Sequence, residues 1–255
     1  MTMLAGPSLL WAHVPKNAGS YVTRLLMRWG LADWDTVQRF VRLDHNSHQG
    51  LRVIPERHRA PRLCLATVRS PWERYVSAAH YWLGQDGRAG EFVAQFVDGA
   101  EVGDVVPIPD IIWGMLEPPD RVAWTIPYPP HRSETLGEEL RRRDVGLCTW
   151  TQELICADAA GSWLADALVD VGQVGAGLPA VLDRAGLWQP AWLADVLSEP
   201  AANVNGRYDS AQWRSYYTPE LAALVAHKDR RIVDLMGYRL DGPPSRAVWW
   251  GGAYR

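Results

Sequence analysis

Lysine, glycine and small polar residues that can bind an anion follow one another in a loop near the start of the chain. An apolar run over 9–14 has the length of a buried strand, and the loop PKNAGS follows it. Apolar residues at helical spacing over 22–29 and a stop at Gly30 then predict a helix. A strand, a loop and a helix in this order direct the loop's N–H groups and the positive end of the helix toward one point. We therefore predict that a phosphate-like group is bound by the loop residues Lys16, Asn17, Ala18, Gly19 and Ser20.

Lys16 distinguishes this loop from the magnesium-binding loop of nucleoside triphosphatases. In that pattern the lysine follows the last glycine, and a serine or threonine that binds magnesium comes next. Here Lys16 precedes Gly19, and Asn17 follows it. An ordinary strand-to-helix turn with a surface lysine is the alternative. Among the 26 basic residues only Lys16 and Lys228 are lysines, so a lysine in the loop indicates a role for a compact point charge.

A second strand, turn and helix come later in the chain. The run Leu63–Val68 predicts a buried strand, and Arg69 stands at its carboxyl end. SPWE over 70–73 predicts a helix start, with a serine cap, a proline at the first helical position and a glutamate that completes a capping box. Ser77 lies further along this helix. Arg69 could instead pair with Glu73 or face solvent, and Ser77 could be a small residue that permits close packing.

Two parallel strands whose carboxyl ends both carry cationic turns form a crevice suited to a ligand with phosphates at two ends. HVPKNAGS, followed later by VRSPWERYVSAAHY, resembles the superfamily of sulfotransferases that use 3′-phosphoadenosine-5′-phosphosulfate (PAPS). The resemblance is strongest to its carbohydrate-type and related bacterial members. The segment over 203–238, which contains YYTPEL and ends in GY, resembles the closing region of the same family.

The resemblance implies a fold, a ligand and a set of contacts. The implied fold is a P-loop-like three-layer α/β sandwich with a central, mostly parallel sheet flanked by helices, in a single sulfotransferase domain over 1–255. The Lys16 loop would hold the 5′-phosphosulfate of PAPS, and Arg69 and Ser77 would hold its 3′-phosphate. The tail over 241–255 is interpreted either as a loose end or as a cover over a pocket.

The chain departs from the family pattern at two positions. Tyr21 stands where the family usually has threonine or serine, which puts one hydroxyl contact to phosphate in doubt. Ser70 replaces the usual acidic residue after the strand arginine, and serine caps a helix as well as aspartate does.

The donor implies a mechanism. Sulfuryl transfer, like phosphoryl transfer, depends on in-line geometry and charge stabilisation. As the S–O bond breaks, negative charge grows on the departing adenosine 3′,5′-bisphosphate (PAP), and Lys16 is expected to neutralise it without a metal. The acceptor hydroxyl needs a base, and related enzymes with a histidine before the strand arginine favour His48. The rivals are His45 and Asp44, and a polar loop with solvent-facing histidines is the alternative. His13 is a poorer candidate, because a buried, hydrogen-bonded histidine is expected there.

Composition limits the partners and the compartment. A net charge of −3 gives no overall basic field of the kind that binds nucleic acid. No apolar run approaches the roughly 20 residues that span a bilayer, and the N-terminus lacks the pattern of a signal peptide. Cys64, Cys148 and Cys156 lie in apolar surroundings without metal-binding spacing. Buried, reduced thiols in a cytoplasmic protein are therefore expected.

The remaining segments give weaker signals. Val145–Trp150 is interpreted as another buried strand, with a helix opening at Thr151. Five further helices are expected, over 91–98, 134–143, 162–171, 190–197 and from Thr218 to Gly237. Trp113, Trp124 and Tyr128 could stack on a sugar or aromatic acceptor, although most tryptophans in globular chains are packing residues.

The acceptor is expected to be a saccharide or a small natural product, and its identity and the oligomeric state stay open. Two other functions are weighed against sulfuryl transfer. One is a kinase-like phosphotransferase using Mg-ATP, which the missing serine or threonine after Lys16 disfavours. The other is a nucleotide-binding protein without turnover, which the combination of Lys16, Arg69 and Ser77 disfavours.

Overall fold

The computed structural model describes residues 3–40, 50–83, 89–101, 104–119, 122, 135–198 and 212–251. Its chain forms two compact units. The first comprises Met1–Arg69, Thr151–Asn203 and Pro243–Arg255, and the second comprises Ser70–Trp150 and Val204–Gly242. The single sulfotransferase domain expected over 1–255 stays a prediction.

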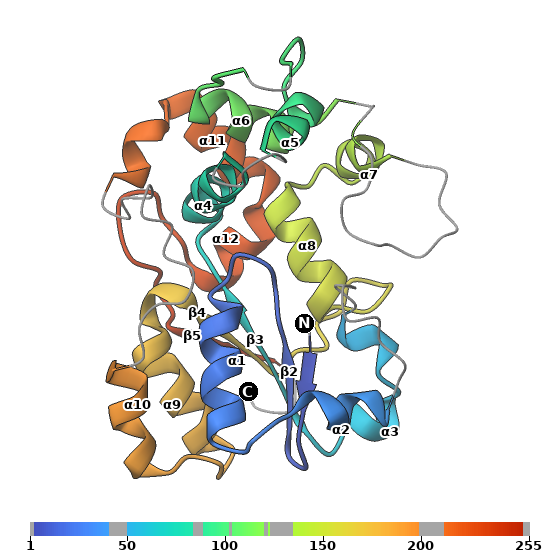
Figure 1. Cartoon of the computed structure of the whole chain (residues 1–255), viewed down its shortest axis with the longest axis vertical. Coiled ribbons are helices and arrows are strands. Elements are labelled where there is room, and N and C mark those ends of the chain that lie inside the picture. The colour runs from blue at the N-terminus through green and yellow to red at the C-terminus, as the bar shows by residue number, and fades with distance from the viewer. Residues whose placement is uncertain are drawn as a thin grey trace. The chain divides into compact units, whose positions relative to one another are not determined.

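The first unit is built on a five-stranded mixed sheet (Figure 1). Strands that follow one another along the chain are also neighbours in the sheet. The three central strands are parallel, and each edge strand is antiparallel to its neighbour. The strands are β1 (Met3–Ala5), β2 (Leu9–Ala12), β3 (Leu63–Val68), β4 (Ala167–Asp170) and β5 (Val248–Trp250). The protein is therefore a mixed α/β protein.

The strands that precede the two predicted anion-binding turns form as the sequence predicts. Every residue of β2 and β3 is buried, as is typical of central parallel strands with near-continuous apolar sequences. β2 ends at Ala12, earlier than the predicted Val14. Leu9 pairs with Leu63 and Ala12 with Ala66. This parallel pairing brings the carboxyl ends of β2 and β3 to the same edge of the sheet.

Helices pack against this sheet (Figure 1). Helix α1 (Gly19–Arg28) follows the loop and buries the face that carries Val22, Leu25 and Leu26. Trp11 Nε1 donates a hydrogen bond of 3.0 Å to Thr23 Oγ1 and joins β2 to α1. The other helices that lie wholly in the first unit are α2 (Trp34–Gln38), α3 (Glu56–Arg59), α9 (Val174–Arg184) and α10 (Leu193–Ser198).

Strand β4 corrects one prediction. The sequence predicts a helix over 162–171, but the structure has β4 near the end of that stretch, over Ala167–Asp170, with every residue of the strand buried. It pairs with β3 on one side and with β5 on the other. A strand in this position loses the alternation of polar and apolar residues that identifies strands, so periodicity alone cannot recognise it. The helix expected over 190–197 is confirmed as a 3-10 helix, Pro190–Trp192, that continues into α10.

Helices make up most of the described part of the second unit. Helix α4 (Pro71–Leu83) begins at the predicted proline. Among the described residues, buried Ser70 Oγ has no hydrogen-bond partner, so the capping box predicted for Ser70 and Glu73 does not form. The other helices are α5 (Ala89–Phe96), α6 (Ile108–Leu116), α7 (Leu136–Arg143), α8 (Leu147–Cys156), α11 (Pro219–Lys228) and α12 (Arg230–Met236), of which α8 continues into the first unit at Thr151.

Helix α8 replaces the strand predicted over 145–150, and its N-terminus depends on a residue distant in sequence. Asp229 Oδ1 accepts a hydrogen bond of 2.6 Å from Thr149 N. A Cβ at Gly146 would lie 2.4 Å from Asp229 Oδ2, so the carboxylate occupies the space that a side chain would need. Asp229 also divides the predicted last helix into α11 and α12, which ends at Gly237 as predicted.

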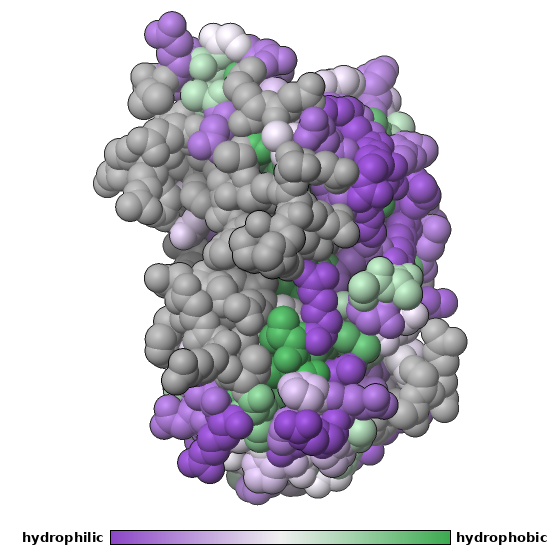
Figure 2. Space-filling view, turned by 90° about the vertical axis from the view of Figure 1, so that its right-hand side faces the viewer, coloured by the Kyte–Doolittle hydropathy of each residue, from purple (hydrophilic) through white to green (hydrophobic). Residues whose placement is uncertain are grey.

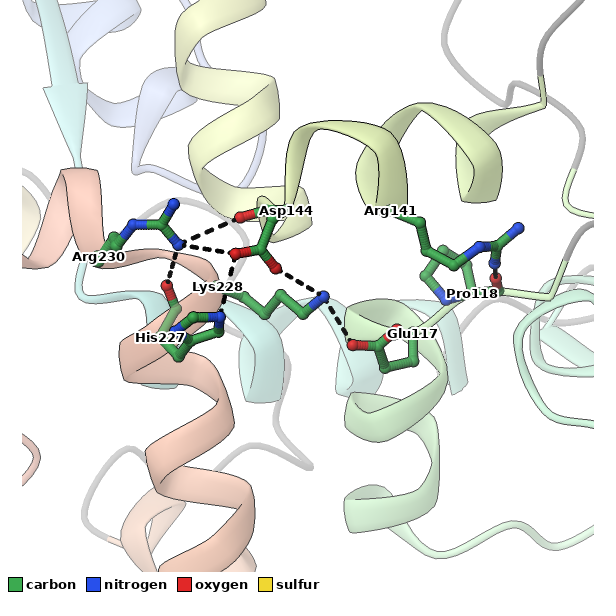
Figure 3. Close-up of polar contacts among 7 residues, drawn as sticks. All are labelled: Glu117, Pro118, Arg141, Asp144, His227, Lys228 and Arg230. Carbon is green, nitrogen blue, oxygen red and sulfur yellow. Dashed lines mark hydrogen bonds and ion pairs between the residues drawn. The ribbon is translucent and has the colours of Figure 1, made fainter.

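Charged side chains join the ends of several helices in the second unit (Figure 3). Lys228 Nζ lies 2.8 Å from Glu117 Oε1 and 3.2 Å from Asp144 Oδ1. Asp144 Oδ2 also lies 3.1 Å from His227 Nε2 and 3.2 Å from Arg230 Nη1. Asp144 ends α7 in the left-handed conformation, with a φ of 49°. The second lysine of the chain is thus an ion-pair partner within the helical unit.

The surface and the cysteines fit the composition of the chain. On the face shown in Figure 2, hydrophilic residues form much of the described surface, with a smaller hydrophobic area among them. Among the helices that the structure describes, none has the length and apolar character needed to cross a membrane.

All three cysteines lie in described ranges, where they are buried and form no disulfide.

Candidate anion-binding site

The loop between β2 and α1 has a strained backbone. Lys16 and Ala18 have positive φ angles of 64° and 53°, and Asn17 between them does not. A positive φ costs a residue other than glycine roughly 1–2 kcal/mol. Alternation in the sign of φ turns successive N–H groups toward one side and forms a concavity that suits an anion. Strain of this kind is typical of functional loops.

The N-terminus of α1 lies at the end of the same loop. Ala18 is the N-cap residue, and its methyl side chain cannot cap the helix. The first turn of α1 carries no acidic residue. The first N–H groups of a helix have no partner within the helix, and the helix dipole leaves positive charge at this end. These features together suit a bound anion.

His13 lies against the first residue of α1. A Cβ at Gly19 would be 1.9 Å from His13 Cδ2 and 2.2 Å from His13 Nε2, so only glycine fits beside the ring. His13 is half-buried, directly after β2. The structure therefore brings an imidazole to the anion-binding loop, although the sequence favours His48 over His13 as the base.

Arg69 lies beside the Lys16 loop. Its Nη1 donates a hydrogen bond of 3.4 Å to Lys16 O. The two residues are distant in sequence, and the parallel pairing of β2 with β3 brings their turns together. Two of the residues that the sequence predicts for the anion site are therefore neighbours in the first unit.

Asn17, a third predicted site residue, directs its side chain into the protein. It is fully buried, and its Nδ2 donates to Thr67 O at 3.2 Å and to Gln152 Oε1 at 3.0 Å. Its backbone N–H donates to Val14 O at 3.3 Å. The Asn17 side chain therefore anchors the loop to the protein interior. Its neighbours in the predicted site are Lys16, Ala18, Gly19 and Ser20.

The other predicted site residues belong to the second unit or lie outside the described residues. Ser77 is half-buried on α4 in the second unit. Trp113 lies on α6 in the same unit, and 51% of it is exposed. The base candidates His48, His45 and Asp44 and the aromatic candidates Trp124 and Tyr128 lie outside the described residues.

Three residues near the site, Thr67, Gln152 and Asp170, are not predicted from the sequence. Thr67 and Gln152 contact Asn17 directly. Asp170 is a buried carboxylate at the carboxyl end of β4, paired in register with Val68. The interpretation of 162–171 as a helix concealed Asp170, because a helix gives no reason to place it beside β3.

Thiol chemistry does not fit the buried cysteines. Burial raises the pKa of Cys64 to about 12, and the charge of Asp166 adds to the shift. Burial likewise raises the pKa of Cys148, together with the charge of Asp229. Thiolates are the reactive form of cysteine, so these two residues are poor nucleophiles at neutral pH. Within the described ranges, no group of three or more His, Cys, Asp or Glu residues could hold a metal ion.

Comparisons with models of protein families, with curated proteins and with solved structures found no match to this chain.

Proposed function

We propose that the protein is a sulfotransferase that moves the sulfuryl group of PAPS to an acceptor hydroxyl. The observation that carries the proposal is the contact between the two predicted phosphate-binding turns, with Arg69 Nη1 3.4 Å from Lys16 O. Cationic turns at the carboxyl ends of neighbouring parallel strands suit a ligand with phosphates at two ends. The proposal includes membership of the PAPS-dependent sulfotransferase superfamily and its P-loop-like three-layer fold.

The proposed reaction is a direct in-line transfer. The acceptor oxygen attacks sulfur, the bond from sulfur to the 5′-phosphate oxygen breaks, and the acceptor's proton passes to a base. Lys16, the loop N–H groups and the N-terminus of α1 stabilise the charge that grows on the departing PAP. Arg69 binds the 3′-phosphate, and Ser77 is a second contact suggested by the resemblance. His48 stays the predicted base, with His45 as its rival, in a cytoplasmic enzyme acting on a saccharide or small natural product.

The surroundings of Asn17 argue against a kinase that uses Mg-ATP. In the magnesium-binding loop, the residue after the lysine supplies a hydroxyl to the metal. Asn17 occupies that place, and its side chain is fully buried against Thr67 and Gln152. It therefore cannot act as a metal ligand unless the loop rearranges, whereas sulfuryl transfer requires no metal there.

Thermal unfolding with added nucleotides tests the proposal. We expect PAP to raise the melting temperature in the presence of EDTA, because the loop and Arg69 bind phosphates without a metal. Adenosine 5′-monophosphate, which lacks the 3′-phosphate, serves as the matched control and should give a smaller rise. Stabilisation by Mg-ATP with none by PAP would overturn the proposal in favour of the kinase.

A further inference from the structure

Asn17, Thr67 and Gln152 form a buried polar cluster behind the anion-binding loop. Their exposed fractions are 0%, 1% and 1%. Asn17 belongs to the loop, Thr67 to β3 and Gln152 to α8. Thr67 Oγ1 donates a hydrogen bond to Asn17 O. The cluster therefore holds the backbone of Asn17 as well as its side chain.

The hydrogen bonds fix the orientation of both amides in this buried polar cluster. Asn17 Nδ2 donates to Thr67 O and to Gln152 Oε1, at 3.2 and 3.0 Å. Gln152 Nε2 donates to the same Thr67 O at 3.2 Å and to Cys156 Sγ at 3.5 Å. A carbonyl oxygen can only accept, so reversing either amide would set an oxygen against Thr67 O. The N–H groups of both amides are therefore fully used.

Gln152 has a specific part in this arrangement. Asn17 and Thr67 belong to the two strand-and-turn segments that carry Lys16 and Arg69, whereas Gln152 comes from α8. Asn17 Oδ1 is buried without a hydrogen-bond partner among the described residues, so this amide already carries one unsatisfied buried atom. Loss of the Gln152 carbonyl would leave one of the two N–H bonds of Asn17 Nδ2 without an acceptor as well, which favours rotation of the Asn17 side chain.

Rotation of Asn17 would act on the loop through its neighbours. Lys16 and Ala18, on either side of Asn17, hold left-handed conformations that are unfavourable for residues with a Cβ. Such conformations persist where surrounding contacts over-determine them. The contacts of Asn17 with Thr67 and Gln152 supply that restraint, and the direction of the loop's N–H groups depends on it.

We propose that Gln152 is a positioning residue for the anion-binding loop. It orients the Asn17 amide, and through Asn17 it keeps Lys16 and Ala18 in the conformations that turn their N–H groups toward the ligand. The part of this inference that concerns PAP rests on the proposed function. The part that concerns the loop in the unbound protein does not.

Hydrogen–deuterium exchange of the unbound protein separates positioning from stability. Gln152→Leu keeps the size of the side chain and removes its hydrogen bonds. The matched control is Ile155→Ala, because Ile155 is fully buried on the same helix and lies outside the cluster. We expect the amides over 16–20 to exchange about tenfold faster in Gln152→Leu than in wild type, and at the wild-type rate in Ile155→Ala. Unchanged exchange in Gln152→Leu, or equal acceleration in both variants, would overturn the inference.

Binding of PAP, measured by calorimetry on the same variants, gives the second readout. We expect Gln152→Leu to weaken PAP binding about tenfold and Ile155→Ala to leave it unchanged, since a loop that must be ordered on binding binds less tightly. If wild type does not bind PAP while Gln152→Leu still frees the loop, the proposed function fails and the positioning role stands. If wild type binds PAP and Gln152→Leu binds it equally well, the positioning role fails and the proposed function stands.

Discussion

Lys16 and Lys228, the two lysines of the chain, have different surroundings. Lys16 is half-buried in the strained loop at the start of α1, beside Arg69. Lys228 is 8% exposed and pairs with Glu117 and Asp144. Because lysine is rare in this chain, the sequence suggests a special role for both residues, but their contacts give them different roles. Lys16 is suited to a ligand, and Lys228 joins helices.

Replacement of Lys16 should remove turnover while the fold stays intact. Lys16→Met removes the charge expected to stabilise departing PAP, and loss of one such group typically costs about 100- to 1000-fold in kcat. The control is Lys228→Met, which should lower the urea midpoint because it leaves the carboxylates of Glu117 and Asp144 without their shared partner. Radiolabelled sulfate transfer and urea unfolding measure the two effects. Normal transfer by Lys16→Met would show that Lys16 does not stabilise the leaving group.

Asp144 makes a pH-dependent contribution to stability. The hydrogen bond from Lys228 lowers the pKa of Asp144, and Arg230 and His227 act in the same direction. Because the folded pKa lies below the unfolded value of about 3.9, the folded state binds fewer protons between the two values. The stabilisation is therefore complete above the unfolded value and is lost as pH falls through the folded one.

Urea unfolding of wild type and Asp144→Asn from pH 6 down to the acid limit of folding tests this dependence. We expect wild type to be the more stable at pH 6 and the difference to shrink as the solution becomes acidic. A difference that is constant across this range would mean that the charge of Asp144 does not contribute. Asp144 is almost half exposed, so the effect is small and decreases with added salt.

Among the elements, the sequence predicts best those whose ends are encoded locally. The apolar run of β3, the proline that begins α4 and the glycine after α12 are all where the sequence predicts them. The same local patterns locate Lys16 and Arg69 at strand ends, and parallel pairing then makes them neighbours. That part of the site follows from strand order and strand direction alone.

The elements that the sequence assigns wrongly depend on distant residues. β4 is defined by its two neighbouring strands, and the start of α8 is defined by Asp229. Gln152 contacts Asn17 because α8 is a helix, and a strand at 145–150 gives no reason to expect that contact. Tertiary contacts of this kind override local propensity and leave no periodic signal.

The cap that Asp229 supplies to α8 should be essential for stability. Asp229→Ala would leave Thr149 N and Tyr75 Oη buried without their acceptor, since both donate to this carboxylate. We expect a loss of roughly 2–5 kcal/mol in the free energy of unfolding. The control Asp234→Ala removes an exposed carboxylate from α12 and should change stability by less than about 0.5 kcal/mol. Equal effects of the two substitutions on urea unfolding would refute the capping role.

At the scale of the whole molecule, the order of the chain explains why the sheet is hard to read from sequence. β3 and β4 are adjacent parallel strands, yet the chain leaves the first unit at Arg69 and returns to it at Thr151. The intervening residues form much of the helical second unit. Arg69 is therefore a predicted ligand-binding residue and also the last residue of the first unit before the chain enters the second unit. Sequence separation of this size gives no indication of which strands pair.

The central claim is that turns on two parallel strands bind the two phosphate groups of one adenosine nucleotide. Calorimetric titration of wild type and Arg69→Ala with PAP and with adenosine 5′-monophosphate tests it most directly, with Arg62→Ala as the control because Arg62 bonds Gly6 O and His58 O just before β3. We expect wild type and Arg62→Ala to prefer PAP by about tenfold or more, as a charge-assisted contact to the 3′-phosphate predicts. In Arg69→Ala we expect that preference to disappear while monophosphate binding persists. An equal preference for PAP in Arg69→Ala and wild type would contradict the account.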